Sequence, residues 1–216
     1  MINLTRYSAI LFDFDGTLVD SWPGVCDAYT QGYQFFNPGA DMQHIYSLRN
    51  DNREYKEAIK YVFKTSIQNT MYEKKIAEIY LRDLLKNVRI FPGVQEVITH
   101  LKSIGKPWGI VTTKEEIFVR AIIEAYPFLD TQYLICGNHV KNKKPDPEGL
   151  LLAAKQFGMA ANSKLLYVGD LESDITAAKA AGFSSACALY GYCDQREAML
   201  NWRPDLYLKN IDELVP

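Results

Sequence analysis

The sequence lacks the features that mark secreted or membrane-spanning chains. Its four cysteines form no Cys-x-x-Cys pair, and Cys136 and Cys187 lie in apolar runs, so we expect free buried thiols. The first residues do not combine a basic stretch with an apolar segment, so no signal peptide is predicted. No apolar run approaches the ~20 residues needed to cross a bilayer. These absences favour a cytoplasmic location without a membrane partner.

The sequence also lacks a strong charge of either sign, internal repeats and low-complexity segments. A formal net charge of -2 over 216 residues gives no reason to expect a nucleic-acid partner. With 48% hydrophobic and 23% charged residues, the composition is typical of a globular protein. A chain of this length can bury a sizeable core without disulfides or structural metals.

Short apolar runs alternate with helical patterns along most of the chain. Strands are predicted at Ala9–Phe12, Trp108–Val111, Tyr133–Cys136, Leu165–Val168, Ser185–Leu189 and Leu206–Leu208. Helices are predicted at Val94–Ser103, Glu115–Glu124, Pro147–Phe157 and Glu172–Ala181. This alternation predicts an α/β fold, a Rossmann-like doubly wound parallel sheet built from right-handed βαβ units.

The segment 21–87 has a different pattern. It contains helical stretches at Val25–Phe36, Arg53–Lys64 and Met71–Lys86 and no convincing strand. A helical block of that size is too long for a simple crossover between two strands. We therefore predict an all-helical cap domain of residues 21–87, inserted into an α/β core domain of residues 1–20 and 88–216.

Polar residues lie at or shortly after the ends of four predicted strands. They are Asp13 and Asp15, Thr112, Lys144, and Asp170 and Asp174. In an open α/β sheet, ligands bind beyond the carboxyl ends of the strands. The sequence therefore predicts that these side chains meet at one edge of the sheet.

The residue types at that edge suit phosphoryl transfer. A carboxylate such as Asp13 can act as a nucleophile and form an aspartyl-phosphate, which divides hydrolysis into two easier steps. Asp15, two residues on and followed by Gly16, can act as the general acid and base. Thr112 would donate to a phosphoryl oxygen, and Lys144 would neutralise Asp13 and the charge that develops on the transferred group.

The carboxylates at this edge also predict a metal site. Asp13, Asp170 and Asp174 would repel one another and a phosphate dianion. A hard cation removes that conflict, and oxygen-only ligands indicate Mg²⁺. We expect ligands from the Asp13 and Asp170 carboxylates and the Asp15 backbone carbonyl. Asp174 has three alternatives: direct ligation, ligation through water, or a local capping bond at the start of its helix.

The chain resembles the haloacid dehalogenase-like hydrolase superfamily in four motifs. They are Asp13–Ser21 (Asp-Phe-Asp-Gly-Thr-Leu-Val-Asp-Ser), Ile110–Thr112, Lys144–Pro145 and Gly169–Asp174. The first motif and Gly191–Tyr192 are most similar to phosphoglycolate-phosphatase-like members. The resemblance covers the whole chain. It implies a Rossmann-like core with a helical C1-type cap, and it supports the same roles for the motif residues.

Two positions depart from the pattern of these relatives. Thr113 stands where they often have Asn, and His44–Asn52 lacks the Arg-plus-Gly pattern common in their caps, with Arg49 as a possible remnant. Both departures concern residues around the substrate, so the resemblance leaves the substrate open.

The hypothesis from sequence is an enzyme, a Mg²⁺-dependent phosphoric monoester hydrolase. Its expected partner is a small phosphorylated metabolite, such as a phosphoglycolate-like ester, a sugar phosphate or a nucleotide, and it would be a monomer or homodimer. The alternatives are a sugar phosphomutase with the same machinery and a non-catalytic protein that binds a phospho-ligand. A dehalogenase is disfavoured, because Asp15 has no task when the leaving group is a halide.

Overall fold

The structure, a computed structural model, describes residues 2, 4–36, 38–39, 70–192 and 196–215. The chain divides into two compact units. Unit 1 comprises residues 1–20 and 90–216, and unit 2 comprises residues 21–89. The division from the sequence, 1–20 with 88–216 and 21–87, differs by two residues at the second boundary.

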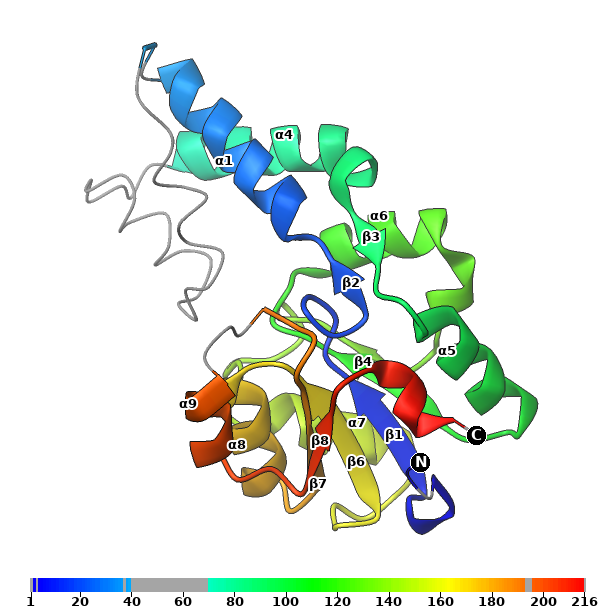
Figure 1. The fold of residues 1–216 in the computed structure, drawn as a ribbon. Helices are drawn as coiled ribbons and strands as arrows, with labels where there is room; N and C mark the ends of the chain where they lie inside the picture. Colours follow the sequence, from blue (N-terminus) through cyan, green and yellow to red (C-terminus); the bar gives the residue numbers. More distant parts are fainter. Residues whose placement is uncertain (1, 3, 37, 40–69, 193–195, 216) are drawn as a thin grey trace. The chain divides into compact units, whose positions relative to one another are not determined.

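Unit 1 is built on a six-stranded parallel sheet with the strand order β5-β4-β1-β6-β7-β8 (Figure 1). The strands are β1 Ala9–Phe12, β4 Trp108–Val111, β5 Leu134–Ile135, β6 Leu165–Gly169, β7 Ser184–Ala188 and β8 Leu206–Leu208. Every residue of β1, β4 and β6 is buried, as expected for strands covered on both faces. The predicted fold class is confirmed, and β5 is shorter than the predicted run.

Helices connect these strands. They are α5 Val94–Ser103, α6 Glu116–Ala125, α7 Glu148–Gln156, α8 Glu172–Ala180 and α9 Arg196–Asn201, with the 3-10 helices η1 Leu4–Arg6, η3 Pro127–Leu129 and η4 Ile211–Leu214. The first four lie where the sequence predicted helices. The helix α9 was not predicted, because six residues are too few to display a helical period.

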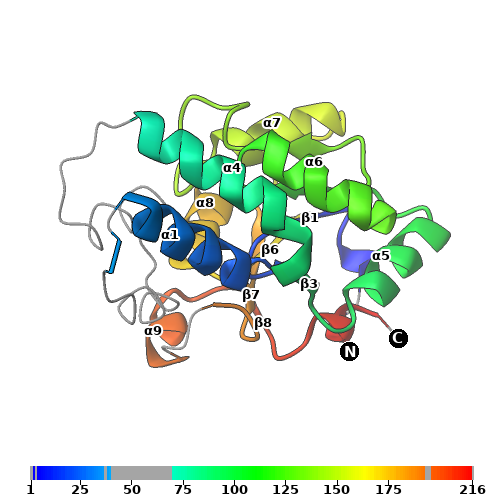
Figure 2. The same cartoon turned by 90° about the horizontal axis from the view of Figure 1, so that it is seen from above.

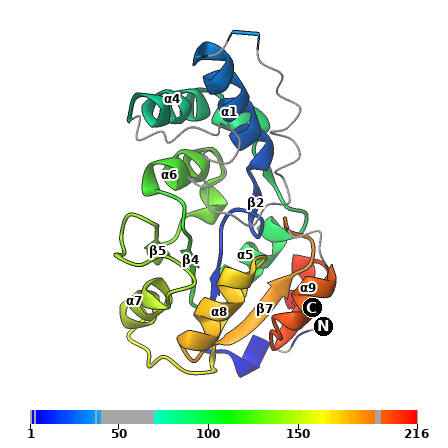
Figure 3. The ribbon, with the colours of Figure 1, turned by 90° about the vertical axis from the view of Figure 1, so that its left-hand side faces the viewer.

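Apolar side chains fill both faces of the sheet. Helices α7 and α8 lie next to each other (Figure 3) and share one core cluster with strand residues such as Leu11 and Val111. Helix α5 lies on the opposite side of the sheet from α8 (Figure 1). Its buried residues Val94, Val97, Ile98 and Leu101 recur at helical spacing. Helices therefore cover both faces of the sheet, and the edge at the carboxyl ends of the strands is where functional side chains can gather.

The strand register aligns the ends of three neighbouring strands. Phe12 of β1 is level with Ile110 of β4 and with Val168 of β6. The Asp13 N–H donates to the Val168 carbonyl at 2.8 Å, which continues that pairing by one residue. Thr112 and Asp170 follow their strands by the same short distance as Asp13. Residues far apart in the chain thus reach one edge of the sheet.

Unit 2 contains the helices α1 Trp22–Phe36 and α4 Thr70–Asn87, which pack side by side (Figure 2). At Gly32 a Cβ atom would lie 2.7 Å from Ile76 Cγ1, so the absence of a side chain allows this close approach. The predicted helix Arg53–Lys64 lies outside the described residues. No helix in the described part of the chain is long and apolar enough to span a membrane.

Two short strands lie where the chain passes between the units. They are β2 Val19–Asp20 and β3 Arg89–Ile90, which form a two-stranded sheet. The sequence analysis did not predict them, because two residues carry no alternation of apolar and polar side chains.

Candidate active site

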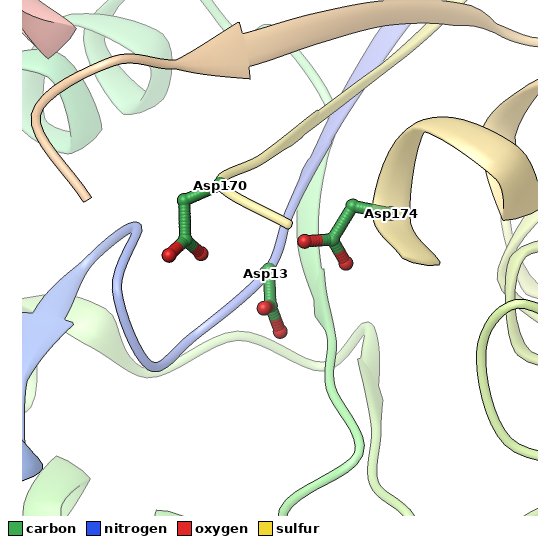
Figure 4. A group of neighbouring side chains, drawn as sticks. All are labelled: Asp13, Asp170 and Asp174. Atoms are coloured by element: carbon green, nitrogen blue, oxygen red, sulfur yellow. The ribbon is translucent and has the colours of Figure 1, made fainter. Parts of the chain in front are cut away.

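Three aspartates meet at the carboxyl edge of the sheet. Asp13 follows β1, Asp170 follows β6, and Asp174 lies in the first turn of α8. Each offers a carboxylate oxygen within 4.8 Å of the others, and all three residues are buried. Figure 4 shows the three side chains next to one another, Asp13 and Asp170 beyond their strands and Asp174 at the start of α8.

The chain turns sharply after Asp13. The Leu18 and Val19 N–H groups both donate to the Phe14 carbonyl, and the Gly16 N–H donates to the Val19 carbonyl. Gly16 has a φ of 81°, and a Cβ atom there would collide with the Asp170 carboxylate. Only glycine satisfies both the left-handed backbone and this contact.

Two donors hold the Asp170 carboxylate. The hydroxyl of the buried Thr17 donates to Oδ1 at 3.2 Å, and the Tyr192 N–H donates to Oδ2 at 2.9 Å. The sequence analysis gave Thr17 and Tyr192 no role, although both belong to segments that carried the family resemblance. Their contacts explain why these segments accompany the aspartates.

Lys144 lies among the carboxylates, with its side chain only 6% exposed. Its Nζ is 2.9 Å from Asp13 Oδ1 and donates to Asp174 Oδ1. It also donates to the Tyr167 hydroxyl at 2.9 Å. The position predicted for the phosphate-binding lysine is thus beside the predicted nucleophile, and Tyr167 is a contact that the sequence did not indicate.

Asp174 combines a local bond with a contact inside the site. Its Oδ2 accepts the Leu171 N–H at 2.9 Å, which satisfies a donor at the start of α8, and its Oδ1 accepts from Lys144. The local capping bond is therefore present, and the same carboxylate also contacts Lys144 inside the site.

Burial and mutual repulsion raise the pKa values of Asp13 and Asp170. Burial raises the pKa of Asp13 to about 7; the Lys144 charge opposes this shift and the Asp174 charge adds to it. Burial also raises the pKa of Asp170 well above its usual range, with further contributions from Asp174 and Asp13. Burial lowers the pKa of Lys144, but the Asp13 and Asp174 charges outweigh it and raise that pKa overall. The single positive charge of Lys144 cannot neutralise the negative charges of three carboxylates.

The site therefore fits a divalent cation. The carboxylate oxygens are buried, close together and under-compensated by positive charge. Hard oxygen donors of this kind suit Mg²⁺, whose charge would favour the ionised form of each acid.

A second ion pair lies beside this cluster. Lys114 Nζ donates to Asp15 Oδ1 at 3.1 Å, with side chains 10% and 24% exposed. The Lys114 N–H donates to Thr112 Oγ1 at 3.2 Å. Accepting that bond uses a lone pair, so the buried Thr112 hydroxyl keeps its proton for another acceptor. The sequence analysis assigned no role to Lys114, although it follows directly after Thr112 and Thr113.

The comparisons with known proteins agree with this geometry. A haloacid dehalogenase-like hydrolase family model matches residues 10–188. The chain belongs to this family. The recognition made from four sequence motifs is confirmed.

Its curated relatives are phosphatases. The chain is 30% identical to an N-acetylmuramic acid 6-phosphate phosphatase of Pseudomonas aeruginosa, over 97% of this chain and 94% of that protein. It is 32% identical to a phosphoglycolate phosphatase of Escherichia coli, over 96% of this chain and 90% of that protein. The predicted enzyme class, a phosphoric monoester hydrolase, is confirmed.

A solved structure shows the same fold. The crystal structure of a predicted phosphoglycolate phosphatase from Haemophilus somnus superimposes with a TM-score of 0.84 at 23% identity, and the match covers 98% of both chains.

Proposed function

We propose that this haloacid dehalogenase-like phosphatase is Mg²⁺-dependent and hydrolyses a small phosphate monoester through an aspartyl-phosphate on Asp13. The observation that carries the proposal is the buried group of Asp13, Asp170 and Asp174 with Lys144 at 2.9 Å from Asp13. A phosphatase of this kind needs a carboxylate nucleophile, positive charge around it and a proton carrier. Asp13 and Lys144 would supply the first two, and Asp15 the third.

In the first step an Asp13 carboxylate oxygen attacks phosphorus, and the bond from phosphorus to the ester oxygen breaks. Asp15, in its protonated form, gives its proton to the departing alkoxide. Lys144 and the Thr112 hydroxyl stabilise the charge on the transferred group. The products of this step are the free alcohol and the aspartyl-phosphate.

In the second step Asp15, now a carboxylate, takes a proton from water while the water oxygen attacks phosphorus. The bond between phosphorus and Asp13 breaks, which restores the nucleophile and releases inorganic phosphate. Lys114, at 3.1 Å from Asp15 Oδ1, holds this carboxylate in place between the two steps. The ion pair thus orients the proton carrier.

Asp13 and Asp170 would hold Mg²⁺ through their carboxylates, together with the backbone carbonyl of Asp15. When bound, the ion neutralises negative charge on Asp13 and on the phosphoryl group. Asp174 would act from outside the ligand set, because its Oδ1 accepts from the positively charged Lys144 and its Oδ2 accepts from the Leu171 N–H at the start of α8. In this role it fixes Lys144 and orients the water shell.

Unit 2 is proposed as the cap, the part of the protein that selects the substrate. Closure of a cap over a site excludes water during the first step and releases product on opening. We also propose a cytoplasmic enzyme that works as a monomer or homodimer.

The names of the relatives suggest a substrate class. N-acetylmuramic acid 6-phosphate and phosphoglycolate are both phosphate monoesters that carry a separate carboxylate. We propose that the substrate of this enzyme is likewise a small phosphorylated acid, ahead of plain sugar phosphates and nucleotides.

A panel assay tests the proposal. Phosphate release would be measured from both of these esters, from sugar phosphates and from nucleotides, with and without Mg²⁺. We expect Mg²⁺-dependent release, fastest with a phosphorylated acid, and none from the Asp13→Asn variant.

Three results would contradict parts of the proposal. Absence of Mg²⁺-dependent release on every ester would exclude the activity. Wild-type rates in Asp13→Asn would exclude the nucleophile. Conversion of a sugar phosphate to its isomer with little free phosphate would indicate the phosphomutase alternative.

A further inference from the structure

The core of unit 1 contains a tyrosine to which the reaction above gives no task. Tyr167 is the third residue of β6 and is fully buried. Its ring packs in the same apolar cluster as Leu11 and Val111, where a phenylalanine ring would fill the same volume. The hydroxyl is therefore the part of this residue that requires an explanation.

That hydroxyl has a defined orientation. It donates to the Val111 carbonyl at 2.7 Å and accepts from Lys144 Nζ at 2.9 Å, whereas Asp174 Oδ1 is farther away at 3.4 Å. A phenol has a single proton, and the closest acceptor, Val111, takes it. The oxygen lone pairs are then left for Lys144. Because Val111 directly precedes Thr112, this bond also ties the lysine to the end of β4.

Lys144 has three N–H donors and meets three acceptors: Asp13 Oδ1, Asp174 Oδ1 and the Tyr167 hydroxyl. Two of these acceptors are carboxylates, and the third is neutral. A lysine ammonium ends a flexible four-carbon stem, so its position depends on its partners. Tyr167 provides a fixed partner on a sheet strand without adding negative charge to the site.

We propose that Tyr167 is a positioning residue, which holds the Lys144 ammonium where it meets the phosphoryl group transferred to Asp13. This inference rests on the proposed function, because it needs Lys144 to act on that group. Without the hydroxyl, the ammonium loses its fixed partner on the sheet and is no longer held at one position beside the group transferred to Asp13. A displacement of this kind costs rate rather than ground-state binding.

The Tyr167→Phe variant tests this directly, since it keeps the ring and removes only the hydroxyl. We expect kcat to fall about 10-fold or more with KM changed by less than about threefold. Affinity for orthovanadate in the presence of Mg²⁺ should fall by a similar factor, because vanadate imitates the transferred group. Vanadate affinity can be measured without knowledge of the substrate.

Ser185→Ala is the matched control. Ser185 lies in register opposite Tyr167 on β7, is fully buried and exchanges hydrogen bonds with Asp205, outside the proposed site. Its loss removes a buried hydroxyl at the same level of the sheet. We expect a lower melting temperature in both variants, but loss of kcat and of vanadate affinity in Tyr167→Phe alone.

A double-mutant cycle with Lys144→Met then separates positioning from packing. If Tyr167 acts through the lysine, adding Tyr167→Phe to Lys144→Met should change kcat by less than about twofold. Additive losses of kcat in the double mutant would overturn the inference. Wild-type kcat and vanadate affinity in Tyr167→Phe would also overturn it. So would losses of kcat and vanadate affinity in Ser185→Ala equal to those in Tyr167→Phe. If the wild type released phosphate from no ester, the proposed function would fall, while the vanadate comparison would still decide the role of Tyr167.

Discussion

Each of the two units contains an aspartate paired with a lysine, and the two pairs differ in almost every physical respect. In unit 1, Asp13 and Lys144 have side chains 8% and 6% exposed. In unit 2, Asp83 contacts Lys86 at 2.7 Å and also Arg82, and these two basic side chains are 73% and 55% exposed. Both members of the first pair are enclosed in the protein, whereas Asp83, with a side chain 12% exposed, meets basic side chains that extend into solvent.

The pKa values of the two aspartates move in opposite directions. Hydrogen bonds from Arg82 and then Lys86 lower the pKa of Asp83, as is usual for an exposed ion pair. Burial raises the pKa of Asp13 to about 7 in spite of Lys144. The same residue types therefore favour an ionised acid in unit 2 and oppose ionisation in unit 1.

The difference indicates that the buried charges of unit 1 serve the site rather than the stability of the fold. Exposed pairs contribute little to stability because solvent and salt screen them. Buried charges cost free energy to desolvate, and their attraction often fails to offset that cost. A cluster of three buried acids is therefore poor as a structural device, which agrees with the proposal that a divalent cation completes the charge balance of this site.

The two units should differ most in the effect on kcat of replacing the aspartate. Asp13→Asn should lower kcat by a factor of about 10³ or more, because an amide cannot form the acyl-phosphate. Asp83→Asn, the same change in the exposed pair, should leave kcat and KM within about twofold of wild type. Steady-state phosphate release measures both, and comparable losses in the two variants would contradict the distinction.

Replacement of the two lysines should give the next largest difference between the units. Lys144→Met should reduce kcat about 100-fold and destabilise the metal-free protein by about 3 kcal/mol, because buried carboxylates lose their counter-charge. Lys86→Met should change the urea midpoint only slightly. An unchanged urea midpoint in Lys144→Met would mean that Asp13 takes up a proton in place of the lysine charge.

Lys114 tests the role assigned to Asp15. Lys114→Met should reduce kcat about 10-fold for alkyl phosphates and less for p-nitrophenyl phosphate, whose phenolate needs little protonation on leaving. Equal losses on both esters, with a raised KM, would instead show that Lys114 binds substrate. If Lys114 binds substrate, the double mutant with Asp15→Asn should have a lower kcat/KM than Asp15→Asn alone. If Lys114 acts through Asp15, as we propose, the second change should cause no further loss of kcat/KM.

The raised pKa of Asp13 predicts a moderate pH effect on metal binding. In metal-free protein, an acid with a pKa of about 7 is mostly protonated at pH 6 and mostly ionised at pH 8. Mg²⁺ must displace that proton at pH 6, so its apparent affinity should be about 10-fold weaker there than at pH 8. Calorimetry at the two pH values measures this, and Asp13→Asn should reduce the difference to the part that comes from Asp170.

The same raised pKa fixes the sign of the stability effect. The unfolded acid loses its proton near its ordinary pKa of 3.8, whereas the folded acid keeps it up to about pH 7. Stability from this group is complete below the lower value and declines as the pH rises to the upper one. Thermal melts of metal-free protein between pH 4 and 8 should show this decline, and Mg²⁺ should restore more stability at the higher pH.

Much of the fold was predictable from local sequence. The strands β1 and β4 have the predicted ends, because buried parallel strands are continuous apolar runs with clear limits. The helix α5 was predicted to the residue from its apolar spacing. The missed elements β2, β3 and α9 span two to six residues, too few for either period to appear.

The sequence by itself determined which chemical groups this protein brings to its sheet edge. The motifs around Asp13, Thr112, Lys144 and Asp170 follow apolar strands, and parallel strands place their carboxyl ends together. Residue type and strand position are local properties, so they can be read along the chain. A phosphatase class followed from them.

Only the tertiary structure decided which of these groups touch. Lys114 meets Asp15 across 99 residues of sequence, and Tyr167 meets Lys144 across 23. Neither contact can be predicted from a spacing in the sequence. The two contacts depend on strand order, on the turn at Gly16 and on the direction of a ring packed in the core. Hydrogen bonds require distances near 3 Å. That accuracy comes from packing of the whole domain, which a linear pattern does not encode.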